Sequence, residues 1–99
     1  MQDEASVGGA KLLVNPISAY PNPAKRILNL SNKTGEENIY SIEFIDMAGK
    51  SVAKISRLQT ASGIAEIDLA GLQLPNGAYL LRVQDDGGNS QSIRFLKAE

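Results

Sequence analysis

The chain of 99 residues contains no histidine, no cysteine and no tryptophan. The missing histidines and cysteines exclude Ser-His-Asp and Cys-His nucleophilic sites, zinc sites built on imidazole or thiolate, haem ligation by histidine, and disulfides. Most enzyme chemistry is therefore absent, and we expect no catalytic residue, no metal site and no cofactor. Because a domain without disulfides is stable on either side of a membrane, the lack of cysteine leaves the compartment open.

The chain also lacks a strong net charge and any long apolar run. Ten Lys and Arg residues stand against eleven Asp and Glu residues, which gives a formal charge of −1. Such a balance creates no field that would hold nucleic acid or an anionic membrane. A membrane-spanning helix needs about 20 consecutive apolar residues, whereas the longest apolar stretch near the start is Leu12 to Val14. We expect no nucleic-acid partner and no membrane insertion.

The first ten residues differ from the rest. Residues 1–10 are acidic and small and include the pair Gly8 and Gly9, a composition that buries little and costs much to order. They have no basic n-region and so do not read as a secretory signal peptide; if the domain is exported, that signal lies elsewhere. The composition predicts a flexible linker at 1–10 and one folded domain at 11–99.

From Lys11 onward, short apolar segments alternate with turn signals, and helical spacing never persists over three turns. Alternation predicts that Tyr40, Ile42 and Phe44 face the core. It predicts strands at Leu12–Val14 continuing through Ile17–Tyr20, and at Arg26–Ser31, Ile39–Asp46, Lys50–Arg57, Ile64–Leu69, Ala78–Gln84 and Ser90–Lys97. Short connections favour antiparallel pairing, because parallel strands need crossover helices. We predict an all-β, immunoglobulin-like antiparallel β-sandwich of about seven strands.

The same alternation sorts the other side chains. The predicted core also includes Leu28, Leu30, Ile67, Leu69, Tyr79, Leu81, Val83, Ile93 and Phe95. Leu80 and Leu96 are predicted to face outward, together with Arg82, Arg94 and Lys97. These leucines are either isolated exposed residues, which are common, or an apolar patch with a basic rim for a partner. The sequence leaves both interpretations open.

The segment Tyr20-Pro21-Asn22-Pro23-Ala24 is the most unusual in the chain. Its two prolines fix φ and restrict the residues before them, so the segment is a stiff elbow. Either it only turns the chain into the next strand, with Tyr20 plugging the end of the sandwich, or it is also a recognition feature.

Three further segments have turn chemistry: Asp46–Gly49, Pro75-Asn76-Gly77 and Asp85–Asn89. The last could offer oxygen ligands to calcium, but it lacks the acidic spacing of an EF-hand, so a hairpin turn is favoured. Asp46 and Asp68 could act as paired catalytic carboxylates only in a cleft. A small sandwich rarely offers one, which favours solvated acids at strand ends.

Five short blocks occur in an informative order: Tyr20–Lys25, Ile42–Lys50, Ile67–Leu72, Asn76–Val83 and Arg94–Lys97. As a set, they make the chain resemble the type A C-terminal sorting domains of cargo proteins secreted by the Bacteroidetes type IX secretion system. Two features depart from the usual pattern of that family. Arg94 stands where lysine is commonest, and Ala98-Glu99 extends past the usual ending.

The resemblance implies a non-enzymatic domain that follows a cargo domain and addresses it through the periplasm to the outer-membrane surface or the extracellular medium. The implied partners are the translocon, a sortase that removes the domain, and the N-terminal cargo domain. The implied cleavage region includes Gly8 and Gly9. The implied recognition residues are Pro21, Asn22, Pro23, Gly49, Lys50, Gly77, Arg94 and Lys97.

The alternative function is an accessory β-sandwich module that binds a glycan or a protein for a secreted enzyme or adhesin. Glycan-binding modules normally expose aromatic rings for stacking on sugars. This chain has five aromatic residues, and alternation assigns at least Phe44, Tyr79 and Phe95 to the core. Too few rings remain to favour this alternative.

Overall fold

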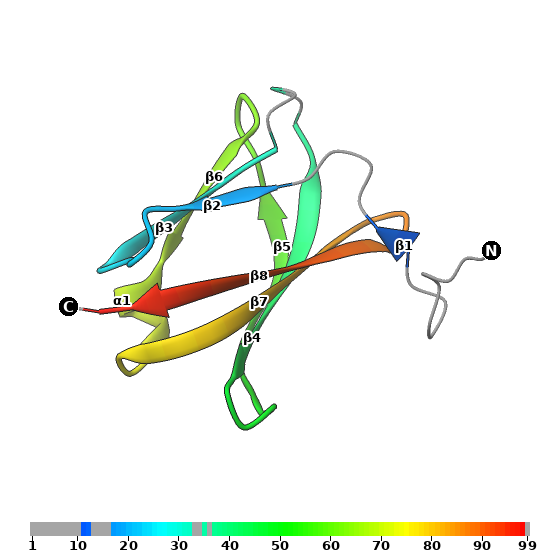
Figure 1. Ribbon diagram of the computed structural model, residues 1–99. Coiled ribbons are helices and arrows are strands. Elements are labelled where there is room, and N and C mark those ends of the chain that lie inside the picture. Colours follow the sequence, from blue (N-terminus) through cyan, green and yellow to red (C-terminus); the bar gives the residue numbers. More distant parts are fainter. Residues whose placement is uncertain (1–10, 13–16, 33–34, 36, 99) are drawn as a thin grey trace.

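The computed structural model describes residues 11–12, 17–32, 35 and 37–98, and it shows two β-sheets packed face to face (Figure 1). The prediction of Gly8 and Gly9 as a cleavage region lies outside the described residues. In chain order the elements are β1 (Lys11–Leu12), β2 (Ser18–Tyr20), β3 (Ile27–Ser31), β4 (Ile39–Asp46), β5 (Ser51–Gln59), β6 (Ile64–Asp68), α1 (Leu69–Leu72), β7 (Gly77–Asp85) and β8 (Asn89–Lys97).

One sheet has the strand order β1-β8-β7-β4-β5 and the other has the order β2-β3-β6. All neighbours in both sheets are antiparallel except β1, whose two residues pair with β8 in parallel. The antiparallel part is therefore a four-strand sheet over a three-strand sheet, which confirms the predicted immunoglobulin-like sandwich. In the part of the chain that the structure describes, no helix is long and apolar enough to cross a membrane.

The predicted strands agree with the observed ones to within one or two residues, with two exceptions. One strand was predicted to run from Leu12–Val14 through Ile17–Tyr20, and this was wrong: Leu12 lies in β1 of the sheet that contains β8, whereas residues 18–20 form β2 of the other sheet, and residues 13–16 are not described. Leu69 was predicted to end a strand, but it begins the one-turn helix α1. The helix forms there because the Asp68 carboxylate accepts a hydrogen bond from Gly71 N at 3.2 Å, a standard N-cap contact.

The core confirms the predicted alternation. Phe44 is fully buried and meets Phe95 edge to face at 5.9 Å, while Tyr79 stacks on Phe95 at 5.7 Å. Ile93 is half-buried and packs against this cluster. Leu28, Leu30, Tyr40, Ile42, Ile67, Leu69, Leu81 and Val83 are also buried. The inner faces of both sheets therefore form one continuous apolar core.

Candidate functional site

Most of the predicted recognition residues gather at one end of the sandwich. Because β7 runs antiparallel to both β4 and β8, its start lies beside their ends: Asp46 pairs with Tyr79, and Lys97 pairs with Gly77. The proline-rich elbow joins the same end through a bridge between Ala24 and Lys97. Helix α1 also begins at this end, because Leu69 N donates to Arg26 O at 2.8 Å. We call this region the elbow end; it comprises residues 20–26, 46–50, 69–77 and 96–98.

The elbow is fastened to the last strand by three hydrogen bonds. The Asn22 side-chain oxygen accepts from Leu96 N at 3.0 Å, and Ala24 N donates to Leu96 O at 2.8 Å. Ala98 N donates to Ala24 O at 2.9 Å. Pro21, Asn22 and Pro23 are exposed, and the peptide bonds that precede both prolines are cis. The elbow therefore holds the edge of β8 while it presents both proline rings to solvent.

The start of β7 is fixed by Tyr79. Its ring is buried, and its hydroxyl donates to the carbonyl of Pro75, four residues upstream. A tyrosine at this corner that bonds back to the backbone is a known feature of immunoglobulin-like sandwiches, the tyrosine corner. Burial raises the pKa of Tyr79, and the nearby carboxylate of Asp46 raises it further. Gly77, two residues before Tyr79, therefore belongs to a corner that has a structural role.

The turn between β4 and β5 carries Gly49 and Lys50. Gly49 has φ of 84°, a conformation that favours glycine. The Asp46 carboxylate accepts from Ala48 N at 3.0 Å and from Lys50 N at 2.9 Å, so this acid shapes the turn. Asp68 caps α1 in a similar way. Both carboxylates thus accept backbone hydrogen bonds at strand ends.

Residues 18–97 match the family of secretion system C-terminal sorting domains. The chain belongs to this family. It is also similar in fold to a solved structure from work on PorZ, described as an essential bacterial surface component of the type-IX secretion system of Porphyromonas gingivalis. The TM-score is 0.51 at 22% sequence identity, over 84% of this chain and 11% of that chain. The match thus covers only a small part of that solved chain. No curated protein matches it.

Lys97 of the sorting domain does not face outward, so that prediction was wrong. Its side chain is only 6% exposed, and Nζ donates to Asn76 Oδ1 at 3.2 Å. Alternation from Phe95 places Lys97 inward instead, and a long aliphatic stem lets the ammonium reach the polar rim. Lys97 therefore helps to hold the elbow end together.

We expect Lys97→Ala to lower the free energy of unfolding by about 1 to 3 kcal/mol, because it removes a buried stem and leaves Asn76 without its donor. Arg94→Ala, at the exposed position directly before the core-facing Phe95, should change the free energy of unfolding by less than about 0.5 kcal/mol. Lys97→Met keeps the stem and should fall between them. Urea denaturation measures all three, and equal midpoints for the two alanine variants would contradict the structural role of Lys97.

Tyr20 also departs from its prediction. It is 42% exposed and does not plug the end of the sandwich. Its neighbour Ala19 packs against the core, so Tyr20 points to the opposite face of β2. Leu69 and Leu74 are buried at this end of the sorting domain instead.

The opposite end of the sandwich contains the predicted hairpin turn between β7 and β8, which is confirmed. One oxygen of the Asp85 carboxylate accepts from Gly87 N and from Asn89 N, both at 2.9 Å. The other oxygen accepts from the Asn89 side chain at 3.0 Å. Asp85 therefore serves the turn itself.

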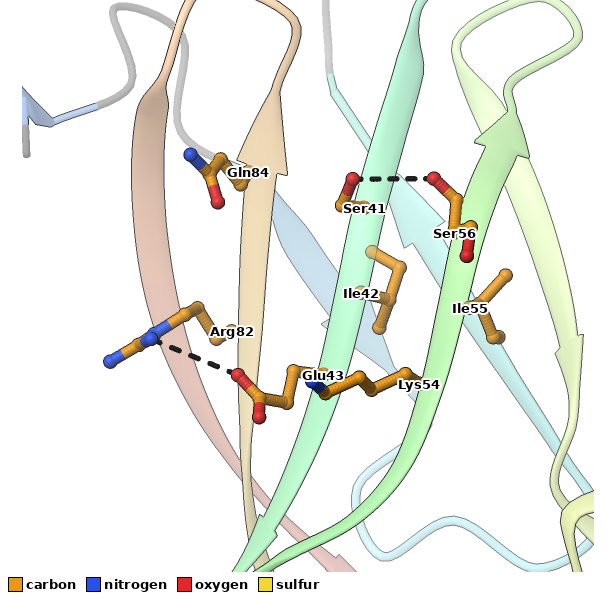
Figure 2. A pocket seen from close by; sticks show the side chains of 8 residues that line it. All are labelled: Ser41, Ile42, Glu43, Lys54, Ile55, Ser56, Arg82 and Gln84. Carbon is orange, nitrogen blue, oxygen red and sulfur yellow. Dashed lines mark hydrogen bonds and ion pairs between the residues drawn. The ribbon is translucent and has the colours of Figure 1, made fainter.

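A shallow depression of about 280 Å³ lies on the outer face of β4, β5 and β7 (Figure 2). It is lined by Ser41, Ile42, Glu43, Lys54, Ile55, Ser56, Arg82 and Gln84. Across its lower part, Arg82 Nη1 lies 3.7 Å from Glu43 Oε1. The lining includes no aromatic ring on which a sugar would stack. Of the predicted recognition residues, those that expose a charged side chain are Lys50 at the turn and Arg94 on β8.

Proposed function

We propose that this chain is the C-terminal secretion and cell-surface sorting signal of an exported cargo protein, and that the type IX translocon recognises it as a folded domain. The observation that carries the proposal is the family match over residues 18–97. All five family blocks have residues in the elbow end, which supports the proposal. The signal is then a surface, not a linear sequence.

The geometry gives a physical reason why the translocon would recognise the domain only in its folded state. Asn22 and Leu96 are 74 residues apart in the chain and are joined by a hydrogen bond. The Gly49-Lys50 turn reaches the same end through the register of β4 with β7. A receptor that contacts this end would find its elements together only after folding, so an unfolded chain would lack the complete surface.

The proposed route runs through the periplasm to the outer-membrane surface or the extracellular medium. We assign residues 11–99 to the sorting domain and residues 1–10 to the linker behind the cargo domain. A sortase would cut within that linker, around Gly8 and Gly9, because a protease needs extended and accessible backbone. Catalysis in this scheme belongs to the sortase, and the sorting domain itself is not an enzyme.

A fusion experiment tests the proposal. Residues 1–99 are placed behind a reporter that is targeted to the periplasm, in a bacterium that has the type IX system. We expect the reporter outside the cell, with a new end inside residues 1–10 by mass spectrometry. A fusion that carries residues 1–10 alone, and a strain without the translocon, are the controls. Stable reporter that stays in the periplasm with the full fusion would contradict the proposal.

The alternative, an accessory glycan- or protein-binding module, has weaker support. Among the described residues, Tyr20 is the one aromatic side chain that is substantially exposed. A single ring gives one stacking contact and no extended sugar platform. Binding of the isolated domain to a glycan array, lost on Tyr20→Ala, would favour the alternative.

A further inference from the structure

The outer face of the large sheet carries aliphatic side chains in register across three strands. Ile45 on β4 pairs with Leu80 on β7, and Leu80 pairs with Arg94 on β8. In the next row, Ala78 pairs with Leu96. Side chains of directly paired residues lie about 5 Å apart on the same face. We call Ile45, Ala78, Leu80 and Leu96 the outer apolar patch, with Arg94 at its edge.

This patch meets solvent in the part of the chain that the structure describes. Leu96 is 43% exposed, and the other three members are half-buried beside one another. The small sheet and α1 lie on other sides of the molecule (Figure 1). Contiguous apolar surface of this kind marks interaction sites more often than scattered single residues do. The register thus favours the second interpretation that the sequence left open.

Charge is distributed unequally between the two outer faces. The outer face of the large sheet carries three basic residues, Lys54, Arg82 and Arg94, and the acidic residue Glu43. Of the three, Arg82 forms an ion pair with Glu43. Arg94 has Leu80 as its cross-strand neighbour. The strands β2, β3 and β6 contain two acidic residues and neither Lys nor Arg. The apolar patch is therefore bordered by positive charge.

The elbow fixes the edge of this patch. Both backbone groups of Leu96 that point away from β7 are bonded to the elbow, to Asn22 and Ala24. These two hydrogen bonds fix the position of Leu96 at the edge of the sheet. A preorganised patch loses less entropy when a partner docks on it. The elbow therefore has a positioning role for the patch in addition to its exposed proline rings.

We propose that the outer apolar patch is a docking face for a protein of the secretion machinery whose own apolar surface is bordered by carboxylates. Leu80 and Leu96 would pack against the apolar part, and the Arg94 guanidinium would bind a carboxylate with paired hydrogen bonds. The inference rests on the proposed sorting function and names the chemistry of the partner. A membrane surface fits less well, because lipid binding of this strength uses clusters of several cations and interfacial aromatic rings, whereas the patch has one unpaired arginine and no ring.

The test compares variants of the 1–99 reporter fusion. Leu96→Gln and Arg94→Glu should each reduce the extracellular reporter by about tenfold or more, the loss expected for a central interface residue. Their melting temperatures should remain close to that of the unchanged domain. Ile64→Gln is the matched apolar control, because Ile64 is 44% exposed on β6 of the other sheet. Arg57→Glu, on the exposed strand β5, is the matched charge control, and both controls should export normally.

Three results would overturn the inference alone, and a fourth would overturn the proposed function as well. The first is normal export of folded Leu96→Gln and Arg94→Glu fusions, which would leave the proposed function standing and remove the patch from it. The second is binding of the purified 1–99 chain to vesicles of anionic phospholipid that Leu96→Gln abolishes, which would assign the patch to a membrane. The third is self-association in analytical ultracentrifugation that Leu96→Gln abolishes, which would assign it to a second copy. An unchanged fusion that is not exported at all would overturn the proposed function together with the patch.

Discussion

Replacing Phe44 by alanine is expected to lower the free energy of unfolding by about 3 to 5 kcal/mol, the usual loss for a buried phenylalanine. The ring is fully buried and packs edge to face on Phe95, which in turn stacks on Tyr79. A small domain has only about 5 to 15 kcal/mol of stability in total. Export of a reporter fusion should fall in parallel, because the elbow end is assembled only in the folded domain.

Glu43→Ala is the matched control for Phe44→Ala, since it changes the adjacent residue of β4 on the opposite face. Its ion pair with Arg82 is solvent-exposed and contributes little, so we expect a change within about 0.5 kcal/mol. Leu81→Ala, which also empties core volume, should resemble Phe44→Ala with a loss of about 2 to 5 kcal/mol. Coincident chemical-denaturation curves for Phe44→Ala and Glu43→Ala would show that the assignment of core and outer faces is wrong.

Gly63→Ala is expected to have the second large effect, about 2 to 5 kcal/mol, for two additive reasons. Gly63 has φ of 81°, which an L side chain adopts only with strain. A Cβ at this position would also lie 2.7 Å from Asn32 Oδ1 and 2.8 Å from the Gly35 Cα. Because one of these neighbours is backbone, the overlap cannot be relieved by a rotamer change.

Gly88→Ala separates the two causes. Gly88 has a similar φ of 86°, but a Cβ there would meet nothing within 4 Å. We expect it to lose only the backbone strain, about 1 to 2 kcal/mol. The difference between the two variants in urea denaturation should therefore be about 1 to 3 kcal/mol, the usual cost of overpacking. Equal losses would mean that the loop around Asn32 yields to the added methyl group.

Alternation in the sequence was sufficient to predict most of the strands and most of the core, because β3, β4, β6 and β7 carry buried side chains at every second residue. The prediction failed at Lys97, because we expected a charged side chain to be solvated although alternation from the buried Phe95 places residue 97 inward. It also missed α1, since a one-turn helix shows no repeat. The Asp68 cap three residues before Gly71 was the available signal. The tyrosine corner was readable too, from Tyr79 four residues after Pro75 at the start of a strand.

The arrangement of the elbow end could not be predicted in this way. The bond between Asn22 and Leu96 joins residues 74 apart in sequence, and neither residue signals the other. The register that brings the Gly49-Lys50 turn to the same end depends on pairing between β4 and β7. The family resemblance indicated which blocks matter. Only the fold shows that Lys97 is buried and bonded to Asn76, while the charged side chains of Lys50 and Arg94 are exposed.

The most direct test of recognition through exposed side chains measures export of a fusion that carries Lys50→Ala and Arg94→Ala together. We expect an unchanged melting temperature and a loss of extracellular reporter of about tenfold or more, because recognition depends on exposed side chains and not on stability. Lys54→Ala with Arg57→Ala removes the same charge from β5 and should export normally. If the folded Lys50→Ala, Arg94→Ala fusion is exported as efficiently as the unchanged fusion, the translocon does not recognise these two cations, and the proposed recognition surface is wrong.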